Sequence, residues 1–565
     1  MSPRPKGMPS SLDYPEASVG DILAGSARRY PDRIALLDGD QALTHAQLHE
    51  QALRFAQGLR EHGIGSGDVV ALHQPNSIWF TVSYYGAILA GAAITPVNPT
   101  LPPAAVCAQL TESGAVAAVT HPATAAALQA AGAEALRLVV LVPPTAAAPA
   151  PEAAAGFEGA VPLGDLLAAE PVPAPGISPD STAHLSFTGG TTGRSKAVQV
   201  LHRNVVCNAI QFTCWRGATL PRVDAQGGIY LEPEPAAATA YTVPPGSGTI
   251  VLVSPLFHAL GLISQTNAVL AGHTSVFSGR FDARHYLDQL EEHGATHVTG
   301  SPAFFHGLLA APDTDRRVLE SVRLVNSGAA PIDTTTLRAV QRLFPHACVI
   351  EGYGLTEATM GLTSGVIDPD KPSPIGSVGL PVFDTEIEIR DLAAPARTVP
   401  VGGTGELWAW GPQITAGYLG HPELTAEQFT GGWLRTGDLA RFDEEGNVHI
   451  VGRAKDMLIY KGYNVYPSQL EEVLGGHPAV EQVSVIGVPA GDAGEIPAAY
   501  DVVRQGKAEP GPTLAEELLA FVAARVAPYQ KVRQVHFLGS LPTSAAGKIL
   551  KAELRQLHER PDHGR

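Results

Sequence analysis

A segment rich in glycine and threonine carries the clearest chemical pattern of the sequence. Residues 187–198 read Phe-Thr-Gly-Gly-Thr-Thr-Gly-Arg-Ser-Lys-Ala-Val. Glycine lets the backbone turn several N–H groups toward one point, and hydroxyls and an ammonium group add further donors for phosphate oxygens. The segment therefore predicts a polyphosphate site. The predicted ligands of this site are Thr188, Gly189, Gly190, Thr191, Thr192, Gly193 and Lys196.

The same segment does not fit the Walker A motif of P-loop nucleotidases. That motif has the form GxxxxGKS/T and opens a helix. Here Gly193 is followed by Arg194 and Ser195 before Lys196, and the residues after Lys196 favour a strand. A kinase or P-loop ATPase is therefore disfavoured. For the segment taken alone, a plain Gly/Thr turn stays an alternative.

Further motifs are spaced along the second half of the chain. They are Tyr353-Gly354-Leu355-Thr356-Glu357, Thr436-Gly437-Asp438, Gly452-Arg453-Ala454-Lys455-Asp456 and Gly547-Lys548-Ile549. Together with the glycine-rich segment, they indicate an enzyme that uses ATP to activate another molecule.

The elements that must position these motifs alternate between strands and helices. Residues 33–37 and 69–72 favour strands. Between them, Thr44 with Gln47 predicts a capped helix that ends at Gly63. Alternation of this kind predicts α/β layers.

Strands are also predicted on both sides of the glycine-rich segment, at 184–187 and 197–201, and a hairpin is predicted across 433–452. Toward the C-terminus, Thr513 with Glu516 predicts the capped start of a helix. Roughly the last 110 residues fit a small α+β domain of ordinary size.

The composition is that of a soluble, globular protein with more than one domain. The chain has 565 residues, of which 45% are hydrophobic and 16% are charged, and this length exceeds a single small core. The formal charge of −17 argues against a nucleic-acid-binding protein, because no net field attracts phosphate backbones. Anionic small molecules must therefore meet local positive charge, and residues 525–555 are rich in Lys and Arg.

The cysteines and the N-terminal residues indicate the compartment. The four cysteines form no CxxC pair and no Cys/His metal spacing, which indicates buried or free thiols in a reducing environment. The N-terminal residues lack the apolar region of a signal peptide, and no apolar run is long enough to span a membrane. We therefore expect a cytoplasmic protein without a transmembrane segment.

The motifs together resemble those of the adenylate-forming superfamily, which contains acyl- and aryl-CoA ligases, beetle luciferases and the adenylation domains of peptide synthetases. The resemblance extends from about residue 19 to about residue 557. It implies a large N-terminal AMP-binding domain of several α/β subdomains at 1–452, a hinge at 453–457 and a small, mobile α+β C-terminal domain at 458–565. It also implies ATP, Mg²⁺ and CoA as cofactors.

The resemblance assigns roles to residues around the nucleotide. The counterpart of 188–196 clamps the β- and γ-phosphates of ATP in this family. The backbone of Ser327-Gly328-Ala329-Ala330-Pro331 resembles the segment that lines the adenine and the acyl pocket, so Gly328 and Ala329 are implied ATP-binding residues. Asp438 would accept hydrogen bonds from both ribose hydroxyls, with support from Arg453. Taken alone, Asp438 also fits a turn-stabilising aspartate.

The run Glu351-Gly352-Tyr353-Gly354-Leu355-Thr356-Glu357 is implied to meet the nucleotide along its length. Tyr353 would stack on adenine, Thr356 would meet the α-phosphate, and Glu357 would hold Mg²⁺ together with Thr188. Mg²⁺ commonly takes one or two protein ligands plus phosphate oxygens, which suits this sparse set. The remaining members of the implied ATP-binding set are Glu351, Gly352 and Gly354.

Lys548 is implied to be the main catalytic residue of adenylation. Attack of a carboxylate on the α-phosphorus builds negative charge on non-bridging oxygens, and a positioned ammonium group stabilises that transition state. The family pattern Pro-Lys-Thr-x-Ser-Gly-Lys stands here as Pro542-Thr543-Ser544-Ala545-Ala546-Gly547-Lys548, with the flanking hydroxyls shifted. A solvated surface lysine is the alternative for Lys548 taken alone.

Two further residues are implied to be catalytic, and two others depart from the family. Lys455 falls at the family's hinge, and Phe257-His258 resembles its aromatic–histidine gate beside the carboxylate, although a histidine in an apolar run is more often a core residue.

Ser195 replaces a usual proline and Ala197 a usual glycine. Neither change removes a chemical group, so we expect tuned rather than lost ATP binding.

The expected reaction has two steps. ATP and a carboxylic acid give an acyl-adenylate and pyrophosphate, and a thiolate then displaces AMP. The small domain would swing about Lys455 between the steps, after which Lys461, Gly462 and Tyr463 would line the pantetheine tunnel. CoA is the expected acceptor, and a separate carrier protein is the alternative.

The expected small-molecule partner is an apolar carboxylic acid, fatty or aryl. The predicted pocket walls, near 258–263, 301–306, 326–330 and 353–361, are small and apolar with few charges. A monomer or homodimer is expected, and the identity and chain length of the acid stay open. A non-catalytic nucleotide-binding protein with the same fold is the alternative from another functional class.

Overall fold

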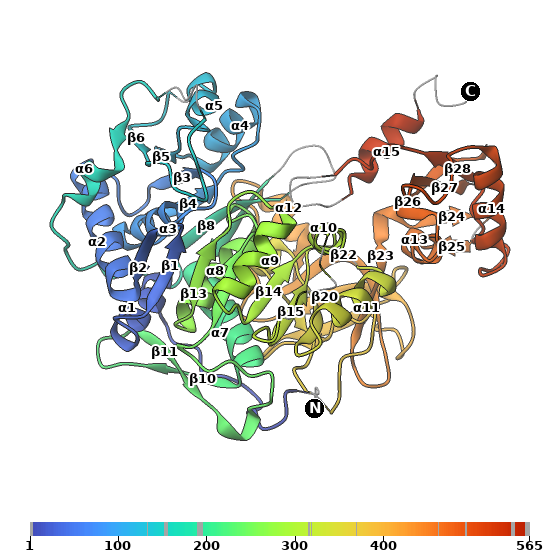
Figure 1. The fold of residues 1–565 in the computed structure, drawn as a ribbon, viewed down its shortest axis with the longest axis horizontal. Helices are drawn as coiled ribbons and strands as arrows, with labels where there is room; N and C mark the ends of the chain where they lie inside the picture. The colour runs from blue at the N-terminus through green and yellow to red at the C-terminus, as the bar shows by residue number, and fades with distance from the viewer. Residues whose placement is uncertain are drawn as a thin grey trace.

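A large N-terminal α/β body and a smaller C-terminal unit make up the chain (Figure 1). The computed structural model describes residues 4–132, 134–151, 156–188, 196–312, 314, 317, 319–330, 332–368, 370–461, 463–491, 494–543 and 549–559. Within these residues, two large sheets with helices between and outside them build the body, which confirms the predicted fold class. None of the described helices is both long and apolar enough to cross a membrane.

The first large sheet consists mainly of parallel strands. Its order is β7-β6-β5-β3-β4-β8-β9, and β8 and β9 at its edge run antiparallel. On β3, Val70 and Leu72 face one core and Ala71 faces another, so both faces of the sheet are covered. The strands are β3 (Val69–His73), β4 (Ala93–Pro96), β5 (Ala117–Thr120), β6 (Leu138–Leu141), β7 (Val161–Pro162), β8 (Thr182–Phe187) and β9 (Ala197–Leu201).

Helices lie on both faces of this sheet. The predicted capping box begins α2: Gln47 N–H donates to Thr44 Oγ1 at 3.2 Å, and Thr44 N–H donates to Gln47 Oε1 at 2.9 Å. The helix ends close to the predicted Gly63. The helices of this region are α1 (Val19–Arg29), α2 (His45–Glu61), α3 (Ile78–Ala90), α4 (Pro103–Ser113), α5 (Ala125–Ala130) and α6 (Leu163–Leu167).

The second large sheet has the order β18-β17-β16-β15-β14-β12-β13-β1-β2. Its parallel strands β14, β15 and β16 end at one edge, as ligand-binding α/β sheets do. The strands are β1 (Ile34–Asp38), β2 (Gln41–Thr44), β12 (Thr249–Leu252), β13 (Thr274–Phe277), β14 (His297–Gly300), β15 (Leu324–Ser327), β16 (Cys348–Tyr353), β17 (Thr363–Ser364) and β18 (Leu380–Pro381).

One hydrophobic core lies between the two large sheets and another lies on the far side of the second sheet. The first core includes residues of α7 and α8, and the second includes residues of α9, α10 and α11. These helices are α7 (His202–Gly217), α8 (Ala259–Leu270), α9 (Ala283–Glu292), α10 (Pro302–Leu309) and α11 (Thr334–Leu343).

The predicted hairpin across 433–452 is confirmed as β22 and β23 in a third, antiparallel sheet. Its turn is closed by Asp443, whose Oδ1 accepts the N–H groups of Asn447 at 2.7 Å and Glu445 at 3.1 Å. The elements here are β19 (Glu386–Arg390), β20 (Gly405–Trp410), α12 (Pro422–Gln428), β21 (Phe429–Thr430), β22 (Trp433–Phe442) and β23 (Val448–Arg453).

The C-terminal unit has the predicted α+β composition. Glu471 Oε1 accepts from Lys551 Nζ and from Val485 N–H, both at 2.7 Å, which ties its first helix, a strand and its last helix together. Its elements are β24 (Leu458–Tyr460), β25 (Tyr463–Val465), α13 (Pro467–Gly475), β26 (Val480–Pro489), β27 (Glu495–Val503), α14 (Pro512–Ala523), β28 (Gln534–Phe537) and α15 (Lys551–His558).

The prediction that Thr513 caps a helix with Glu516 was wrong. Helix α14 begins two residues earlier than this prediction, at Pro512, and Gly511 occupies the N-cap position. Proline is favoured at the first helical position because the N–H that it lacks has no partner there in any helix. Thr513 therefore lies inside the first turn.

A hairpin of β10 (Thr219–Val223) and β11 (Ile229–Pro233) packs against α1 at the edge of the body. The backbones approach so closely at Gly25 that a Cβ atom there would lie 2.0 Å from Ile229 O. Only glycine fits this contact.

We expect Gly25→Ala to lower the melting temperature, because the backbone of β11 must move to relieve the overlap, at a cost of about 1–3 kcal/mol. Differential scanning calorimetry measures the change. The matched control is Gly164→Ala, since Gly164 is exposed in α6 and a Cβ there would meet nothing within 4 Å. An unchanged melting temperature for Gly25→Ala would contradict this packing.

Candidate active site

The predicted phosphate-binding segment, residues 188–196, joins β8 to β9 and is called the phosphate loop below. At its two ends, Thr188 N–H donates to Lys196 O at 3.2 Å. The structure therefore places both ends of the loop, and its phosphate-binding role stays a prediction. The predicted ligands that lie outside the described residues are Gly189, Gly190, Thr191, Thr192 and Gly193.

Lys196 and Glu357 meet at one tyrosine. Lys196 Nζ lies 5.9 Å from the centre of the Tyr418 ring, and Tyr418 OH donates to Glu357 Oε1 at 2.7 Å. Burial, and then the charge of Glu357, raises the pKa of the Tyr418 phenol, which therefore stays a protonated donor. These contacts place a cation of the phosphate loop near the Tyr418 ring and the predicted metal ligand at the Tyr418 hydroxyl.

Backbone hydrogen bonds fix the segment that carries Tyr418. Gln199 N–H of β9 donates to Gly417 O at 2.8 Å. On the other side, the N–H and the hydroxyl of Thr415 both donate to Glu357 O at 3.0 Å. The segment is therefore held between β9 and the turn at Glu357.

Three predicted nucleotide-binding residues form a second cluster, called the Asp438 cluster. Tyr353 OH donates to Asp438 Oδ2 at 2.5 Å, and Arg453 Nε donates to Asp438 Oδ1 at 2.7 Å. The Asp438 side chain is 5% exposed, so these donors replace the water that a carboxylate otherwise requires.

Titration behaviour follows from this burial. Burial, and then the Asp438 charge, raises the pKa of Tyr353 well above its ordinary value. For Arg453, burial alone would lower the pKa, but the Asp438 charge and its neighbours outweigh burial and raise it. Tyr353 therefore stays a neutral phenol and Arg453 a cation across the physiological range.

Strand register explains how the Asp438 cluster forms. Asp438 and Arg453 stand directly opposite each other in the β22–β23 hairpin, and such cross-strand neighbours contact each other. Tyr353 comes from the end of β16 in the second large sheet, where its N–H donates to Thr363 Oγ1 at 3.1 Å. The cluster thus connects two different sheets.

The turn after β16 depends on a close backbone approach. A Cβ atom at Gly354 would lie 1.9 Å from Met360 O, so only glycine fits there. Thr356 and Glu357 follow in the short helix η3 (Thr356–Ala358). The turn therefore presents both residues immediately beyond the end of the sheet.

Gly328 and Ala329 follow β15 beside the end of β16. The parallel register pairs Ser327 with Glu351, so Gly328 comes next to Gly352. Ala329 has a φ of 68°, in the left-handed region that residues with side chains rarely adopt. Such backbone conformations concentrate at functional sites, and this one lies where the backbone is expected to line the nucleotide.

Glu351 is a buried carboxyl group on β16. It is 8% exposed, and burial raises its pKa to about 7 against the opposing effect of a hydrogen bond from the Gly376 backbone. Its part in ATP binding stays a prediction. The structure adds a group that titrates near neutral pH.

His258 forms the N-cap of α8, and its Nδ1 accepts the Leu260 N–H at 3.4 Å. It is half-buried rather than part of the closed core. Asn76 holds the preceding segment, because its Oδ1 accepts the Leu256 N–H and its Nδ2 donates to Ser254 O, both at 2.9 Å. The gate role of His258 stays a prediction.

Lys455 lies in the short helix η4 (Ala454–Asp456), between β23 and the C-terminal unit. Burial, and then the charge of Arg453, lowers its pKa. Next to it, Asp456 pairs with Arg555 of α15 at 2.7 Å. This position fits the predicted hinge at 453–457, which stays a prediction.

Two of the predicted CoA-binding residues, Lys461 and Tyr463, lie on the β24–β25 hairpin of the C-terminal unit. Lys461 Nζ lies 5.4 Å from the centre of the Tyr460 ring, and the Tyr463 ring stacks on Tyr529 with 4.8 Å between centroids. The predicted residues Gly462 and Lys548 lie outside the described part of the chain.

Sequence analysis did not identify Tyr418 or Arg216. Tyr418 gives no local signal, because it contacts Glu357 only through the fold. Arg216 does give a local signal in the sequence. It is the only charged residue between 204 and 217, on a helix whose other residues are largely buried. A single cation at the end of such a stretch indicates that its charge pairs either with an acidic side chain or with a bound ligand.

The residues at Glu357 fit Mg²⁺, although they do not demonstrate it. Among the described residues there is no cluster of three or more His, Cys, Asp or Glu side chains. Glu357 accepts one hydrogen bond from Tyr418 on Oε1, and Thr188 begins the phosphate loop. One carboxylate and one hydroxyl suit an ion that takes its other ligands from phosphate and water.

Family models match two parts of the chain. Residues 23–419 match a model described as AMP-binding enzyme, and residues 469–548 match one described as AMP-binding enzyme C-terminal domain. The first covers the phosphate loop and β16, and the second covers most of the C-terminal unit.

Relatives and solved structures resemble the chain over nearly its whole length. It is 31% identical to 4-coumarate–CoA ligase-like 6 of Arabidopsis thaliana, over 97% of this chain and 92% of that protein. It is 33% identical to feruloyl-CoA synthase of Amycolatopsis sp, over 94% of this chain and 97% of that protein. The structure of ATP-bound MatB from Rhodopseudomonas palustris superposes with a TM-score of 0.82 and 26% identity, over 96% and 99% of the two chains.

The raised pKa of Glu351 predicts a pH-dependent stability. The folded protein binds this proton more tightly than the unfolded chain, so the contribution is fully present below about pH 4.5 and is lost as pH rises through about 7. Glu351→Gln cannot ionise and should gain stability relative to the native protein over this range, by on the order of 3 kcal/mol. Urea denaturation at a series of pH values measures the difference.

The control is Glu386→Gln, because Glu386 is exposed on β19. Its stability difference from the native protein should not change with pH. A constant difference between Glu351→Gln and the native protein would contradict the raised pKa.

Proposed function

This chain belongs to the AMP-binding enzyme family, and we propose that it activates an aryl carboxylic acid through the residues described above. It is an AMP-forming acid–thiol ligase, which converts an acid and ATP to acyl-AMP and pyrophosphate and transfers the acyl group to CoA. The names of the 4-coumarate–CoA ligase-like and feruloyl-CoA synthase relatives support an aryl acid rather than a fatty acid.

The Asp438 cluster is the observation that carries this proposal. Each oxygen of Asp438 already accepts one hydrogen bond, from Tyr353 or Arg453, and a carboxylate has further lone pairs for two ribose hydroxyls. Tyr353 would offer its ring to the adenine. Thr356 and Glu357 follow it in the chain, on the path that the phosphates would take.

In the first step, a carboxylate oxygen of the acid attacks the α-phosphorus of ATP, and the bond to the pyrophosphate oxygen breaks. Lys196 and the phosphate loop would hold the β- and γ-phosphates, and Thr356 would meet the α-phosphate. Lys548 would place its ammonium group beside the non-bridging oxygens, where negative charge develops. Mg²⁺ at Thr188 and Glu357 would supply positive charge to the phosphates.

In the second step, the thiolate of CoA attacks the acyl carbon, and the bond to AMP breaks. Rotation about 453–457 would withdraw Lys548 and bring Lys461, Gly462 and Tyr463 to the acyl-adenylate. Tyr463 is 57% exposed and thus accessible to a pantetheine arm. His258 would gate the carboxylate side of the pocket.

Other predictions accompany this proposal. We keep the domain borders at 1–452, 453–457 and 458–565, a cytoplasmic location, and a monomer or homodimer. Loading of a separate carrier protein stays the alternative for the second step. Thioester formed on a phosphopantetheinyl carrier, with CoA inert, would favour that alternative.

Lys548→Ala separates the two steps. We expect acid-dependent exchange of labelled pyrophosphate into ATP to fall by about 100-fold or more, because the charge on the α-phosphate loses its cation. Transfer from supplied acyl-AMP to CoA should fall much less, because Lys548 is withdrawn in that step. Lys507→Ala, an exposed lysine of the same unit, is the matched control and should change neither rate. Full exchange by Lys548→Ala would refute the assigned role.

A further inference from the structure

The last turn of α7 carries a guanidinium group that reaches into the body. Arg216 Nη2 donates to Asn326 Oδ1 at 3.1 Å, and its Nε donates to Ser364 Oγ at 3.4 Å. Its Cζ lies 4.9 Å from the centre of the Phe212 ring, one helical turn earlier. Asn326 and Ser364 are both buried. The side chain thus spans from α7 to β15 and β17.

Arg216 adjoins the residues that are expected to line the acyl group. Ser364 is paired with Gly352 across β16 and β17, and Gly352 directly precedes Tyr353. A Cβ atom on Gly352 would lie 3.8 Å from Arg216 Nη2 and 3.6 Å from Asn326 Oδ1. The guanidinium group is therefore next to the predicted pocket wall rather than elsewhere in the core.

Several side chains on this face of the sheet are partly exposed. On β14, His297 and Thr299 are partly exposed while the residue between them is buried, and Thr299 is the strand neighbour of Asn326. Arg216 is itself partly exposed although its two partners are buried. Arg216 therefore keeps part of its surface accessible on the face of the sheet that carries Thr299 and Asn326.

The charge of Arg216 has no anionic partner among the described residues. Its two neutral acceptors engage two of its five N–H donors. Burial lowers the pKa of Arg216 to about 10, so the group stays cationic at neutral pH. Burial, and then the Arg216 charge, lowers the pKa of neighbouring His297 to about 4, so that imidazole is neutral. A partly desolvated cation without an anion is unfavourable, and an acceptor on a ligand would relieve this cost.

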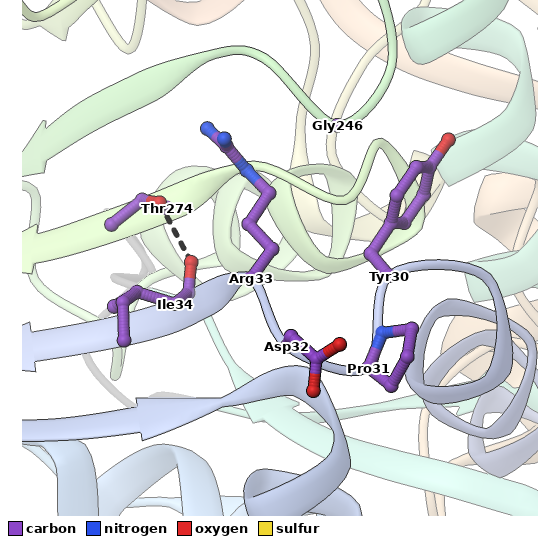
Figure 2. A pocket seen from close by; sticks show the side chains of 7 residues that line it. All are labelled: Tyr30, Pro31, Asp32, Arg33, Ile34, Gly246 and Thr274. Carbon is purple, nitrogen blue, oxygen red and sulfur yellow. Dashed lines mark hydrogen bonds between the residues drawn. The ribbon is translucent and has the colours of Figure 1, made fainter.

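Arg33 provides a comparison elsewhere in the body. It lines an open cavity of about 570 Å³ beside the start of β1 (Figure 2). Its Nη2 donates to Gly248 O at 2.7 Å. Burial lowers the pKa of Arg33 as well. None of the predicted site residues lines this cavity, so Arg33 is a matched control. The other lining residues are Tyr30, Pro31, Asp32, Ile34, Gly246 and Thr274.

We propose that Arg216 selects acids that carry an oxygen acceptor at the end distant from the reacting carboxylate. The inference rests on the proposed function and narrows its substrate class to aryl acids with a ring oxygen substituent opposite the carboxyl arm. An anionic oxygen binds more strongly than a neutral hydroxyl, because charge-assisted hydrogen bonds are stronger. A cationic substituent is rejected, since like charges repel strongly away from water.

The test uses four acids of one shape: cinnamic acid and its 4-hydroxy, 4-carboxy and 4-aminomethyl derivatives. The value of kcat/KM for acid-dependent pyrophosphate release is measured for the native enzyme, Arg216→Met, Arg216→Lys and the control Arg33→Met. We expect the native enzyme to prefer the oxygenated acids over cinnamic acid by about 10- to 100-fold, and to use the aminomethyl acid worst. Arg216→Met should lose this ranking, Arg216→Lys should keep part of it, and Arg33→Met should keep all of it.

Two results would overturn the proposal. One is equal kcat/KM for oxygenated and plain acids in the native enzyme, which decides the matter even if Arg216→Met fails to fold. The other is an unchanged ranking in Arg216→Met whose melting temperature shows that it is folded. If the native enzyme turns over every acid without preference, the role of Arg216 is refuted and the proposed function stands. Turnover of none, with no pyrophosphate exchange, removes the proposed function itself.

Discussion

A buried carboxylate holds two sheets of the large body together. Asp438 comes from the third sheet and Tyr353 from the second, and the Asp438 side chain is only 5% exposed. Because a buried anion is tolerated only where donors replace its hydration, both Tyr353 and Arg453 must reach Asp438. This requirement fixes the β22–β23 hairpin against the end of β16, which is where the parallel strands leave a ligand site.

The Tyr418 contact complements this constraint on the phosphate side. The Lys196 ammonium group lies beside the Tyr418 ring, and the neutral hydroxyl of Tyr418 donates to Glu357. In the proposed function, Lys196 would meet phosphate oxygens of ATP, and Glu357 would meet Mg²⁺. Backbone pairing of the same segment with β9 ties the phosphate loop to the turn after β16.

Patterns confined to a few residues were predictable from the sequence. The capped helix at Thr44 and the hairpin across 433–452 depend on neighbours along the chain, and both are confirmed. Contacts across the fold were not predictable, because the partners lie far apart along the chain. Tyr418 is 61 residues from its partner Glu357, and Arg216 is 110 residues from Asn326. The resemblance supplied the roles in the site, and the role of Lys548 stays a prediction because that residue lies outside the described chain.

The equilibrium affinity of Asp438→Asn for ATP, measured by isothermal titration calorimetry, tests the central claim most directly. The amide keeps the shape of the side chain but leaves the Arg453 cation without its anion and offers the ribose a weaker acceptor. The account predicts that the variant stays folded, as its melting curve would show, and binds ATP about tenfold or more weakly than the native protein. A folded Asp438→Asn with native ATP affinity would contradict it.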